Sequence, residues 1–287
     1  MRHTLKAVIA SGLSLLTAAC SPTKILNYTS SAEDYRVARD IAYGPEPRHQ
    51  LDIYRSDEAT QSANSCRIVF VYGGSWSDGD KNQYGFVGAE LAKLGYEVVI
   101  PDYRLYPKVK HPAFIEDIAL SLRYLADEQP TTQPLVIMGH SAGAMIGSMI
   151  SYEPSYLAAQ GLSTNSIAAN IAISGPHDYF LPTKNPEWAN IFGDDPKKQV
   201  DGLTVNHVQK GAPASLILHG DDDTIVTPKS AESITQKLRA VGSPVTLKTY
   251  EGIGHKEIIA AIATPLHSVA PTLGDIDDYL RENVCEN

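Results

Sequence analysis

The sequence is poor in basic residues and in cysteine. Lysine and arginine together number 24 against 33 aspartates and glutamates, which gives a formal net charge of −9, and no basic run occurs along the chain. Because nucleic-acid phosphates are bound by clustered lysine and arginine side chains, this charge balance argues against a nucleic-acid partner. The sequence also lacks a repeat at a fixed period and zinc-binding spacings such as H-E-x-x-H. We therefore expect neither a repeat architecture nor a zinc enzyme, and no metal or organic cofactor.

Long hydrophobic runs are equally scarce, and the one near the start of the chain is short. Arg2 and Lys6 precede the apolar residues 7–16, and small residues follow. This run is too short to span a bilayer comfortably, and its layout is that of a secretory signal. We expect residues 1–19 to be a signal peptide that is removed on export, and no other stretch to span a membrane.

A cysteine stands directly after this segment. "LTAAC" (16–20) resembles the lipobox of bacterial lipoproteins, with Thr17 in place of the usual Leu. The resemblance implies that Cys20 is lipidated and becomes the mature N-terminus, and Ser21 after it implies the outer membrane, facing the periplasm. Several acyl chains would anchor the protein firmly, because each buried CH₂ contributes about 0.8 kcal/mol. The alternative is an ordinary signal peptide cut near Ala19.

Polar residues with Pro and Ser make up the next stretch, 21–34. We expect residues 20–38 to comprise the lipidated cysteine and a tether, and residues 39–287 to form one catalytic domain. The chain has 287 residues, of which 43% are hydrophobic, and that is sufficient for one α/β domain with a large core.

Apolar runs of strand length alternate with stretches of helical spacing along the rest of the chain. This alternation predicts a mostly parallel sheet with helices on both faces, in which ligands bind at the carboxyl ends of the strands. Residues 176–213 break the rhythm and are expected to form a loop-and-helix insertion over the site. We expect strands at 49–54, 66–72, 96–103, 135–139, 166–175, 214–220 and 245–250, and helices at 84–95, 112–128, 142–152, 229–242 and 273–283.

Gly139, Ser141 and Gly143 stand at alternate positions in "MGHSAG", where a strand is expected to give way to a helix. A tight turn of this kind strains the backbone of its central residue, and small neighbours let the strand and the helix approach each other. The serine hydroxyl then projects above the sheet at a helix N-terminus, whose partial positive charge favours an oxyanion. The pattern G-x-S-x-G is that of a nucleophile elbow. The alternative role for Ser141 is a helix N-cap.

Candidates for a base and an acid follow later strands. A serine hydroxyl is a weak nucleophile that needs a histidine oriented by a carboxylate, in the chain order Ser, Asp, His. "HGDDDTIV" offers Asp221, Asp222 and Asp223, and "EGIGHKE" offers His255. Taken alone, the three aspartates could instead form a solvated turn or a calcium loop, although they lack the ligand spacing of a recognised calcium loop. His255 alone could be a surface histidine. All three elements nevertheless fall at strand ends in the required order, which favours a catalytic triad.

A Gly-Gly pair follows the strand expected at 66–72. The tetrahedral intermediate of acyl transfer needs backbone N–H groups aimed at its oxyanion, and glycines allow the backbone to approach. We therefore assign the oxyanion hole to Gly73, Gly74 and Ser75, together with Ala142 after the nucleophile. A plain Gly-Gly turn is the alternative.

At this point the chain resembles an α/β-hydrolase of the carboxylesterase and arylformamidase type, related to the hormone-sensitive-lipase-like esterases. The resemblance is carried by "DIAYGPEPRHQLDIY", "VYGGSW", "DYRLYP", "HPAFIEDI", "GHSAG", "HGDDDTIV" and "GIGH", which span residues 40–255. It implies a mostly parallel eight-stranded sheet, with Ser141 as nucleophile and His255 as base. The acid of the family stands three residues after the glycine of the HG pair, which selects Asp223.

One position departs from the family pattern. The oxyanion motif usually opens with His, where this chain has Tyr72, and we expect this tyrosine side chain to support the loop. Trp76 and His140, with Tyr72, are the candidates for the substrate pocket, core packing being the alternative for Trp76. Three further polar residues of the resemblance are interpreted as structural, forming an ion pair that fixes the loop: Asp102, Arg104 and Asp117.

These observations predict a serine carboxylesterase that acts on a small-molecule ester without a cofactor. An amidase, arylformamidase or peptidase would use the same triad, and export makes a tryptophan-catabolic formamidase less natural. A non-catalytic envelope lipoprotein on the same fold is an alternative of a different class.

Cys66 and Cys285 are the two cysteines that lipidation of Cys20 would leave. In the fold that the resemblance implies, Cys66 enters a strand at the edge opposite the active site, and the last helix carries Cys285 back to that edge. An exported protein can keep a disulfide, so a Cys66–Cys285 disulfide is a hypothesis. Two separate buried thiols are the alternative.

Overall fold

The structure is a computed structural model that describes residues 22–30, 35–56, 66–178, 186–193 and 195–285. Its centre is an eight-stranded sheet in the order β1-β2-β4-β3-β5-β6-β7-β8. β1 and β2 are antiparallel to their neighbours, and the other six strands run parallel. The mostly parallel sheet predicted from the sequence is therefore confirmed. The strands are β1 (Tyr35–Ala42), β2 (Gln50–Ser56), β3 (Arg67–Val71), β4 (Glu97–Pro101), β5 (Leu135–His140), β6 (Ile167–Ile173), β7 (Ala214–Gly220) and β8 (Val245–Tyr250).

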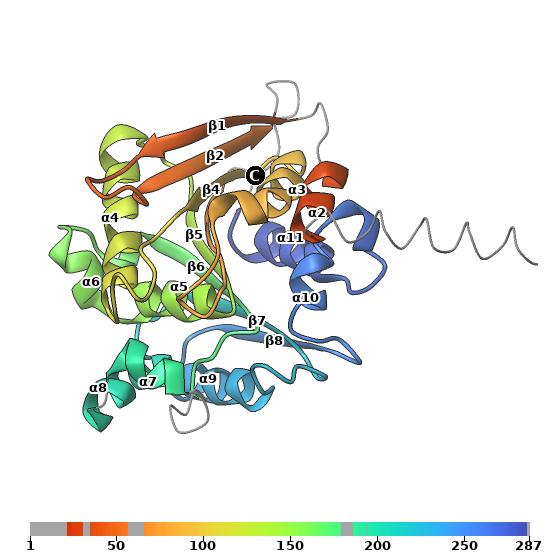
Figure 1. The fold of residues 1–287 in the computed structure, drawn as a ribbon. Helices are drawn as coiled ribbons and strands as arrows, with labels where there is room; N and C mark the ends of the chain where they lie inside the picture. Colours follow the sequence, from red (N-terminus) through yellow and green to blue (C-terminus); the bar gives the residue numbers. More distant parts are fainter. Residues whose placement is uncertain (1–21, 31–34, 57–65, 179–185, 194, 286–287) are drawn as a thin grey trace, which may run out of the picture.

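Helices cover both faces of this sheet (Figure 1). α4 (Ala113–Glu128), α5 (Ala142–Tyr152) and α9 (Lys229–Ala240) lie on one face, and α3 (Gly85–Lys93) and α11 (Thr272–Asn283) lie on the other. Every residue of β3 is buried as a consequence, which explains why its sequence is a continuous apolar run and does not alternate. Short elements fill the connections: α6 (Pro154–Ala159), α10 (Glu257–Ala260), η1 (Lys81–Tyr84), η2 (Thr164–Ser166) and η4 (Thr264–Leu266).

Part of the polar stretch expected to be a tether is instead a helix, α2 (Pro22–Ser30), which lies against α3 and η1. Leu26 packs against the hydrophobic core, and the Asn27 side chain bonds to backbone atoms of the α3 region. These long-range contacts order a segment whose composition alone suggested a tether. β1, which the sequence pattern did not predict as a strand, pairs with β2. The folded part of the chain therefore begins before residue 39, whereas Cys20 and the predicted signal peptide lie outside the described residues.

The insertion between β6 and β7 contains short helices: α7 (Pro186–Phe192), α8 (Pro196–Asp201) and η3 (Thr204–Asn206). Trp188 and Phe192 of α7 pack edge-on against Trp76, with ring centroids 5.9 and 5.0 Å away. The insertion is thus held at the carboxyl end of the sheet by aromatic packing on the loop after β3.

A disulfide joins Cys66, just before β3, to Cys285, just after α11. The two Cα atoms are 5.5 Å apart, and the residues are separated by 219 positions in sequence. The bond ties the C-terminal end of the last helix to the amino edge of the central sheet, opposite the edge where the candidate catalytic residues lie. None of the helices in the described part of the chain has the length and apolar content that a membrane crossing needs.

Candidate active site

Ser141 occupies the turn between β5 and α5 with a backbone conformation that non-glycine residues seldom adopt. Its φ and ψ are 55° and −125°, a strained combination of the kind found at functional turns. Only glycine fits two positions before and two positions after this serine. A Cβ at Gly139 would overlap the carbonyl oxygen of Gly143, and one at Gly143 would overlap that of Val71. Strand and helix therefore meet without side chains between them, and the serine is left at the apex.

Three residues from the ends of three strands form one chain of hydrogen bonds. The Nε2 atom of His255 lies 2.8 Å from the Oγ atom of Ser141. On the other side of the ring, Nδ1 lies 2.7 Å from Oδ2 of Asp223. Asp223 follows β7 and His255 follows β8, so the parallel order β5-β6-β7-β8 brings the three together. The structure therefore places the three residues of the predicted triad within hydrogen-bonding range.

The surroundings of Asp223 keep it ionised. Its Oδ1 accepts hydrogen bonds from the backbone N–H groups of Ile225 and Val226 at 2.9 and 2.8 Å. Burial by itself would raise the pKa of the Asp223 carboxyl, but hydrogen bonds from His219 and His255 outweigh it and hold the pKa well below its usual range. An ionised carboxylate can only accept, so Nδ1 of His255 carries the proton and Nε2 has a lone pair for the serine hydroxyl.

His140, the residue before the serine, supports the histidine loop. Its Nε2–H donates to the backbone carbonyl of His255 at 3.0 Å, and the two rings lie 4.9 Å apart. Burial and the neighbouring His255 lower the pKa of His140 to about 3. The neutral ring thus fixes the His255 backbone without adding a charge beside the base.

The loop after β3 has an unusual backbone over several successive residues. The φ angles of Gly74, Ser75 and Trp76 are +137°, 51° and 59°. A Cβ at Gly73 would lie only 2.9 Å from that of Ser141, so the loop passes directly beside the serine. Within the described part of the chain, the backbone N–H groups of Gly74, Ser75 and Ala142 donate no hydrogen bond. These three amides are available to an oxyanion.

Gly73 differs from these three residues, because its backbone already hydrogen bonds the Tyr84 side chain. That bond opposes the effect of burial, which raises the pKa of Tyr84 to about 12. Gly73 shapes the loop and lines the site.

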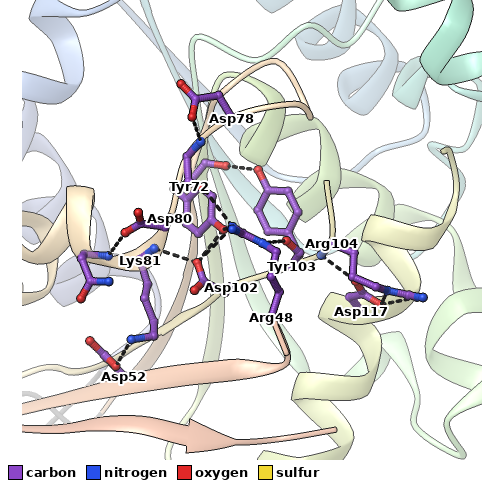
Figure 2. A network of polar contacts seen from close by, with 12 residues as sticks. Arg48, Asp52, Tyr72, Asp78, Asp80, Lys81, Asp102, Tyr103, Arg104 and Asp117 are labelled. Atoms are coloured by element: carbon purple, nitrogen blue, oxygen red, sulfur yellow. Dashed lines mark hydrogen bonds and ion pairs between the residues drawn. The ribbon is translucent and has the colours of Figure 1, made fainter. Parts of the chain in front are cut away.

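Tyr72 does not face the substrate, as the sequence suggested it could, but belongs to a buried polar network beneath the loop (Figure 2). Its hydroxyl donates to Oδ1 of Asp102 at 2.7 Å and accepts from Nη2 of Arg48 at 2.7 Å. Burial, together with Tyr103 and Asp102, raises the pKa of Tyr72 well above its usual range, so the hydroxyl keeps its proton. The pocket assignment of Tyr72 is corrected accordingly, because its ring is fully buried.

Arg48 links the network to both ends of the loop. It donates to the carbonyl oxygens of Gly79 and Tyr103 at 2.8 and 2.7 Å, and Tyr103 in turn donates from its hydroxyl to the carbonyl oxygen of Tyr72 at 2.8 Å. Asp102 also accepts from the Lys81 backbone N–H at 2.8 Å. Residues from two other segments, one before β2 and one after β4, thus hold the loop. Arg48 received no role from the sequence, and the only hint was its place inside one of the stretches that carry the resemblance.

Arg104 and Asp117 form the ion pair that the sequence suggested, beside this network in Figure 2. The guanidinium Nη2 lies 2.6 Å from Oδ1 of Asp117, and the backbone N–H of Arg104 donates to Oδ2 at 2.8 Å. Asp102 belongs to the Tyr72 network and not to this pair.

A cavity of about 460 Å³ opens beside the serine. Of the predicted residues, Gly73, Gly74, Ser75, His140, Ser141 and His255 line it. Trp76 does not, because it is buried against Phe114 and Phe192. Its assignment to the substrate pocket is therefore corrected to the aromatic packing that was the alternative. The sequence also gave no sign that α2 would contribute to the cavity, yet two of its residues line it: Thr23 and Leu26.

Among the described residues, no group of three or more His, Cys, Asp or Glu side chains is arranged to hold a metal ion. The arrangement of Ser141, His255 and Asp223 can deprotonate a serine hydroxyl, and the loop amides can stabilise an oxyanion, which is the chemistry of acyl transfer.

Known proteins resemble this chain in sequence and in fold. The sequence model of the BD-FAE family matches residues 51–238, which is more than half of the chain. The chain is 26% identical over 280 residues to the Arabidopsis thaliana protein named "Probable isoprenylcysteine alpha-carbonyl methylesterase ICMEL2", covering 86% of this chain and 65% of that protein. It is 27% identical over 241 residues to esterase LipC of Mycobacterium tuberculosis, covering 76% and 59%. The chain thus spans about three fifths of the length of these relatives.

Solved structures share the fold. Inhibited esterase B of Lactobacillus rhamnosis superimposes with a TM-score of 0.73 at 20% sequence identity, and the match covers 96% of each chain. This likeness shows that the chain adopts the α/β-hydrolase fold.

Proposed function

Because this chain belongs to the BD-FAE family, we propose that it is a serine hydrolase that cleaves carboxylic esters through an acyl-enzyme on Ser141. The observation that carries the proposal is the unbroken hydrogen-bond chain from Ser141 through His255 to Asp223. Relatives named as esterases support an ester as the substrate. The substrate class is a small-molecule ester that fits the cavity beside the serine.

The reaction follows from the positions of these atoms. Ser141 Oγ attacks the ester carbonyl while His255 Nε2 takes its proton, and Asp223 stabilises the imidazolium that forms. The alcohol leaves with a proton from His255, and the ester acyl group stays on Ser141. Water then attacks the acyl-enzyme with the same base, which releases the acid and restores the serine.

The oxyanion of each tetrahedral intermediate is assigned to the backbone N–H groups of Gly74, Ser75 and Ala142. None of these N–H groups donates a hydrogen bond to another described residue. Ala142 begins α5, and the first N–H groups of a helix lack partners within the helix. Loss of one such donor costs roughly 10²–10³-fold in kcat in a serine protease, so the geometry of this loop governs the rate. No metal or organic cofactor takes part in the proposed reaction.

A fluorophosphonate probe tests the nucleophile directly. We expect a covalent adduct on Ser141 of the folded protein, and none on the Ser141→Ala variant. Absence of the adduct on folded wild-type protein would favour the non-catalytic envelope lipoprotein. A matched pair, p-nitrophenyl acetate and p-nitroacetanilide, then separates an esterase from an amidase or formamidase, and we expect the ester to be cleaved at least 10³-fold faster.

We also propose that Cys20 carries the lipid anchor and holds the domain at the periplasmic face of the outer membrane. The support is the lipobox-like "LTAAC" stretch and the serine that follows it. Expression in a Gram-negative host tests this proposal. The wild type is expected in the outer-membrane fraction with an acylated N-terminal cysteine by mass spectrometry, and Cys20→Ser is expected to abolish the acylation. An unacylated, soluble wild type would indicate an ordinary signal peptide.

A further inference from the structure

We propose that α2, the helix next to the predicted anchor, is a fixed wall of the substrate cavity, and that Leu26 limits the size of the substrate group bound there. The inference deepens the proposed function and rests on it for the identity of the ligand. Thr23 and Leu26 line the same cavity as Ser141 and His255. An N-terminal segment that the sequence marked as a tether thus becomes part of the site.

The position of α2 is set by an asparagine that caps another helix. Asn27 Oδ1 accepts a hydrogen bond of 2.8 Å from the backbone N–H of Phe86, and its Nδ2 donates to the carbonyl oxygen of Asn82 at 2.5 Å. Phe86 stands in the first turn of α3, where backbone N–H groups have no partner within the helix. The contact satisfies this N–H and fixes the register of α2 against α3.

A glycine at the start of α3 favours this close approach. A Cβ at Gly85 would lie 3.3 Å from Oδ1 of Asn27 and 3.2 Å from the hydroxyl of Tyr54, which is tighter than ordinary van der Waals contact. The end of α3 and the body of α2 are therefore complementary, and α2 also contacts η4. These contacts with α3, η1 and η4 make α2 a fixed wall of the cavity.

Leu26 faces an apolar part of the cavity. Phe86 from α3 and Ile259 from α10 line the cavity with it, and Leu26 is itself packed on the core. An apolar substrate group lodged there gains roughly fourfold in binding for each methylene that leaves water, since a buried CH₂ is worth about 0.8 kcal/mol. Leu26 would then set where this gain stops, because a longer group meets its side chain.

Two substitutions move this wall in opposite directions. Leu26→Ala enlarges the cavity, and Leu26→Trp reduces it. Ile25→Ala is the matched control, because Ile25 sits next along the same helix but is 47% exposed and does not line the cavity. Each protein is assayed with p-nitrophenyl esters from acetate to decanoate, and with acetate esters of alcohols of rising length.

We expect Leu26→Ala to raise kcat/KM about tenfold for the longest esters of either the acyl series or the alcohol series, relative to the shortest ester of the same series. Leu26→Trp is expected to lower it by at least as much, and Ile25→Ala to leave the profile unchanged. Activity on acetate, with thermal melting, shows that each variant is folded. Unchanged profiles in both series for both Leu26 variants would overturn the proposal.

Binding measurements separate this inference from the catalytic one. The same esters are titrated into Ser141→Ala protein, with and without each Leu26 substitution, by calorimetry. A shift in the preferred length supports the wall even if the wild type hydrolyses no ester. Absence of hydrolysis would then contradict the proposed function but not the role of Leu26. The same preferred length in all three proteins would remove the wall and leave the esterase proposal standing.

Discussion

The hydroxyl of Tyr72 donates a hydrogen bond of 2.7 Å to Oδ1 of Asp102, at the base of the loop that carries the candidate oxyanion amides. Arg48 approaches the same hydroxyl from the other side and also holds the Gly79 carbonyl. The tyrosine therefore connects the start of the loop, its end and a buried carboxylate. It is a positioning residue, because it touches the loop and not the substrate.

Tyr72→Phe keeps the ring and removes both hydrogen bonds. We expect kcat for p-nitrophenyl acetate to fall by about tenfold or more with KM little changed, because the loop amides lose their alignment with the oxyanion. Stability should fall by about 1–3 kcal/mol, since a buried carboxylate loses a partner. Steady-state kinetics and thermal melting measure the two effects.

Tyr96→Phe is the control for this prediction. Tyr96 also donates a 2.7 Å hydrogen bond to an aspartate, Asp277, but it stands just before β4, at the amino edge of the sheet. The Tyr96→Phe variant should be less stable than the wild type and should keep the wild-type kcat. Equal losses of kcat in the two variants would remove the positioning role of Tyr72.

Asp223→Asn tests which of three adjacent aspartates orients the base. The asparagine oxygen can keep the two backbone N–H bonds that Oδ1 now accepts, which turns its NH₂ group towards His255. Nδ1 must then accept, and Nε2 carries the proton and cannot take one from Ser141. We expect kcat to fall about 10⁴-fold, as for the same change in a serine protease.

Asp222→Asn is the matched change one residue away, on an exposed side chain. We expect it to retain wild-type kcat against p-nitrophenyl acetate, with both variants folded by circular dichroism. If Asp222→Asn were the inactive variant, the assignment of Asp223 would be wrong.

The acid side of the pH profile tests the role of the histidine base. The pKa of Asp223 is held well below its usual range, and that of His140 is lowered to about 3, so neither changes charge near neutral pH. His255 must be neutral to take the serine proton, so kcat/KM should fall as the solution is made acidic. A rate that stays flat on the acid side, with the protein still folded, would contradict the role of His255.

Stability sets the lower limit of that measurement. Because the folded pKa of Asp223 is depressed, its contribution to stability is fully present above the unfolded carboxyl pKa of about 3.9. It is lost as the pH falls below that value, since the unfolded chain then binds more protons. Rates should therefore be read well above this range, with circular dichroism at each pH to show that the protein is folded.

The site residues that could be predicted from the sequence are those whose position depends on strand ends. Ser141, Asp223 and His255 each follow a strand, and parallel strands bring their carboxyl ends to one edge, so chain order was sufficient to associate them. Side-chain direction was not predictable in the same way. The sequence offered both loop support and the substrate pocket for Tyr72, and both the pocket and core packing for Trp76, and the structure shows that both side chains are buried.

Long-range polar contacts account for the rest. Arg48 lies 24 positions before Tyr72 and 54 before Asp102 in the sequence. No local sequence pattern predicts contacts between residues so far apart. α2 has the composition of a linker, and its order comes from Asn27 bonding to a helix that begins 58 residues later, at Gly85 (85 − 27). Local propensity is a weak guide where tertiary contacts decide the conformation.

Cys285→Ser tests the contribution of the disulfide that closes the chain from before β3 to after α11. A bond across 219 positions restricts the unfolded chain strongly, and removal of a native disulfide typically costs about 2–5 kcal/mol. For a domain of this size that corresponds to a melting temperature lower by roughly 4–20 °C.

Since Cys66 precedes its strand and Ser141 follows a neighbouring parallel strand, kcat measured well below the melting temperature should not change. Calorimetry with and without reductant measures the effect: reductant should lower the melting temperature of the wild type and leave the variant unaffected, whereas equal melting of all four samples would show that the disulfide adds no stability.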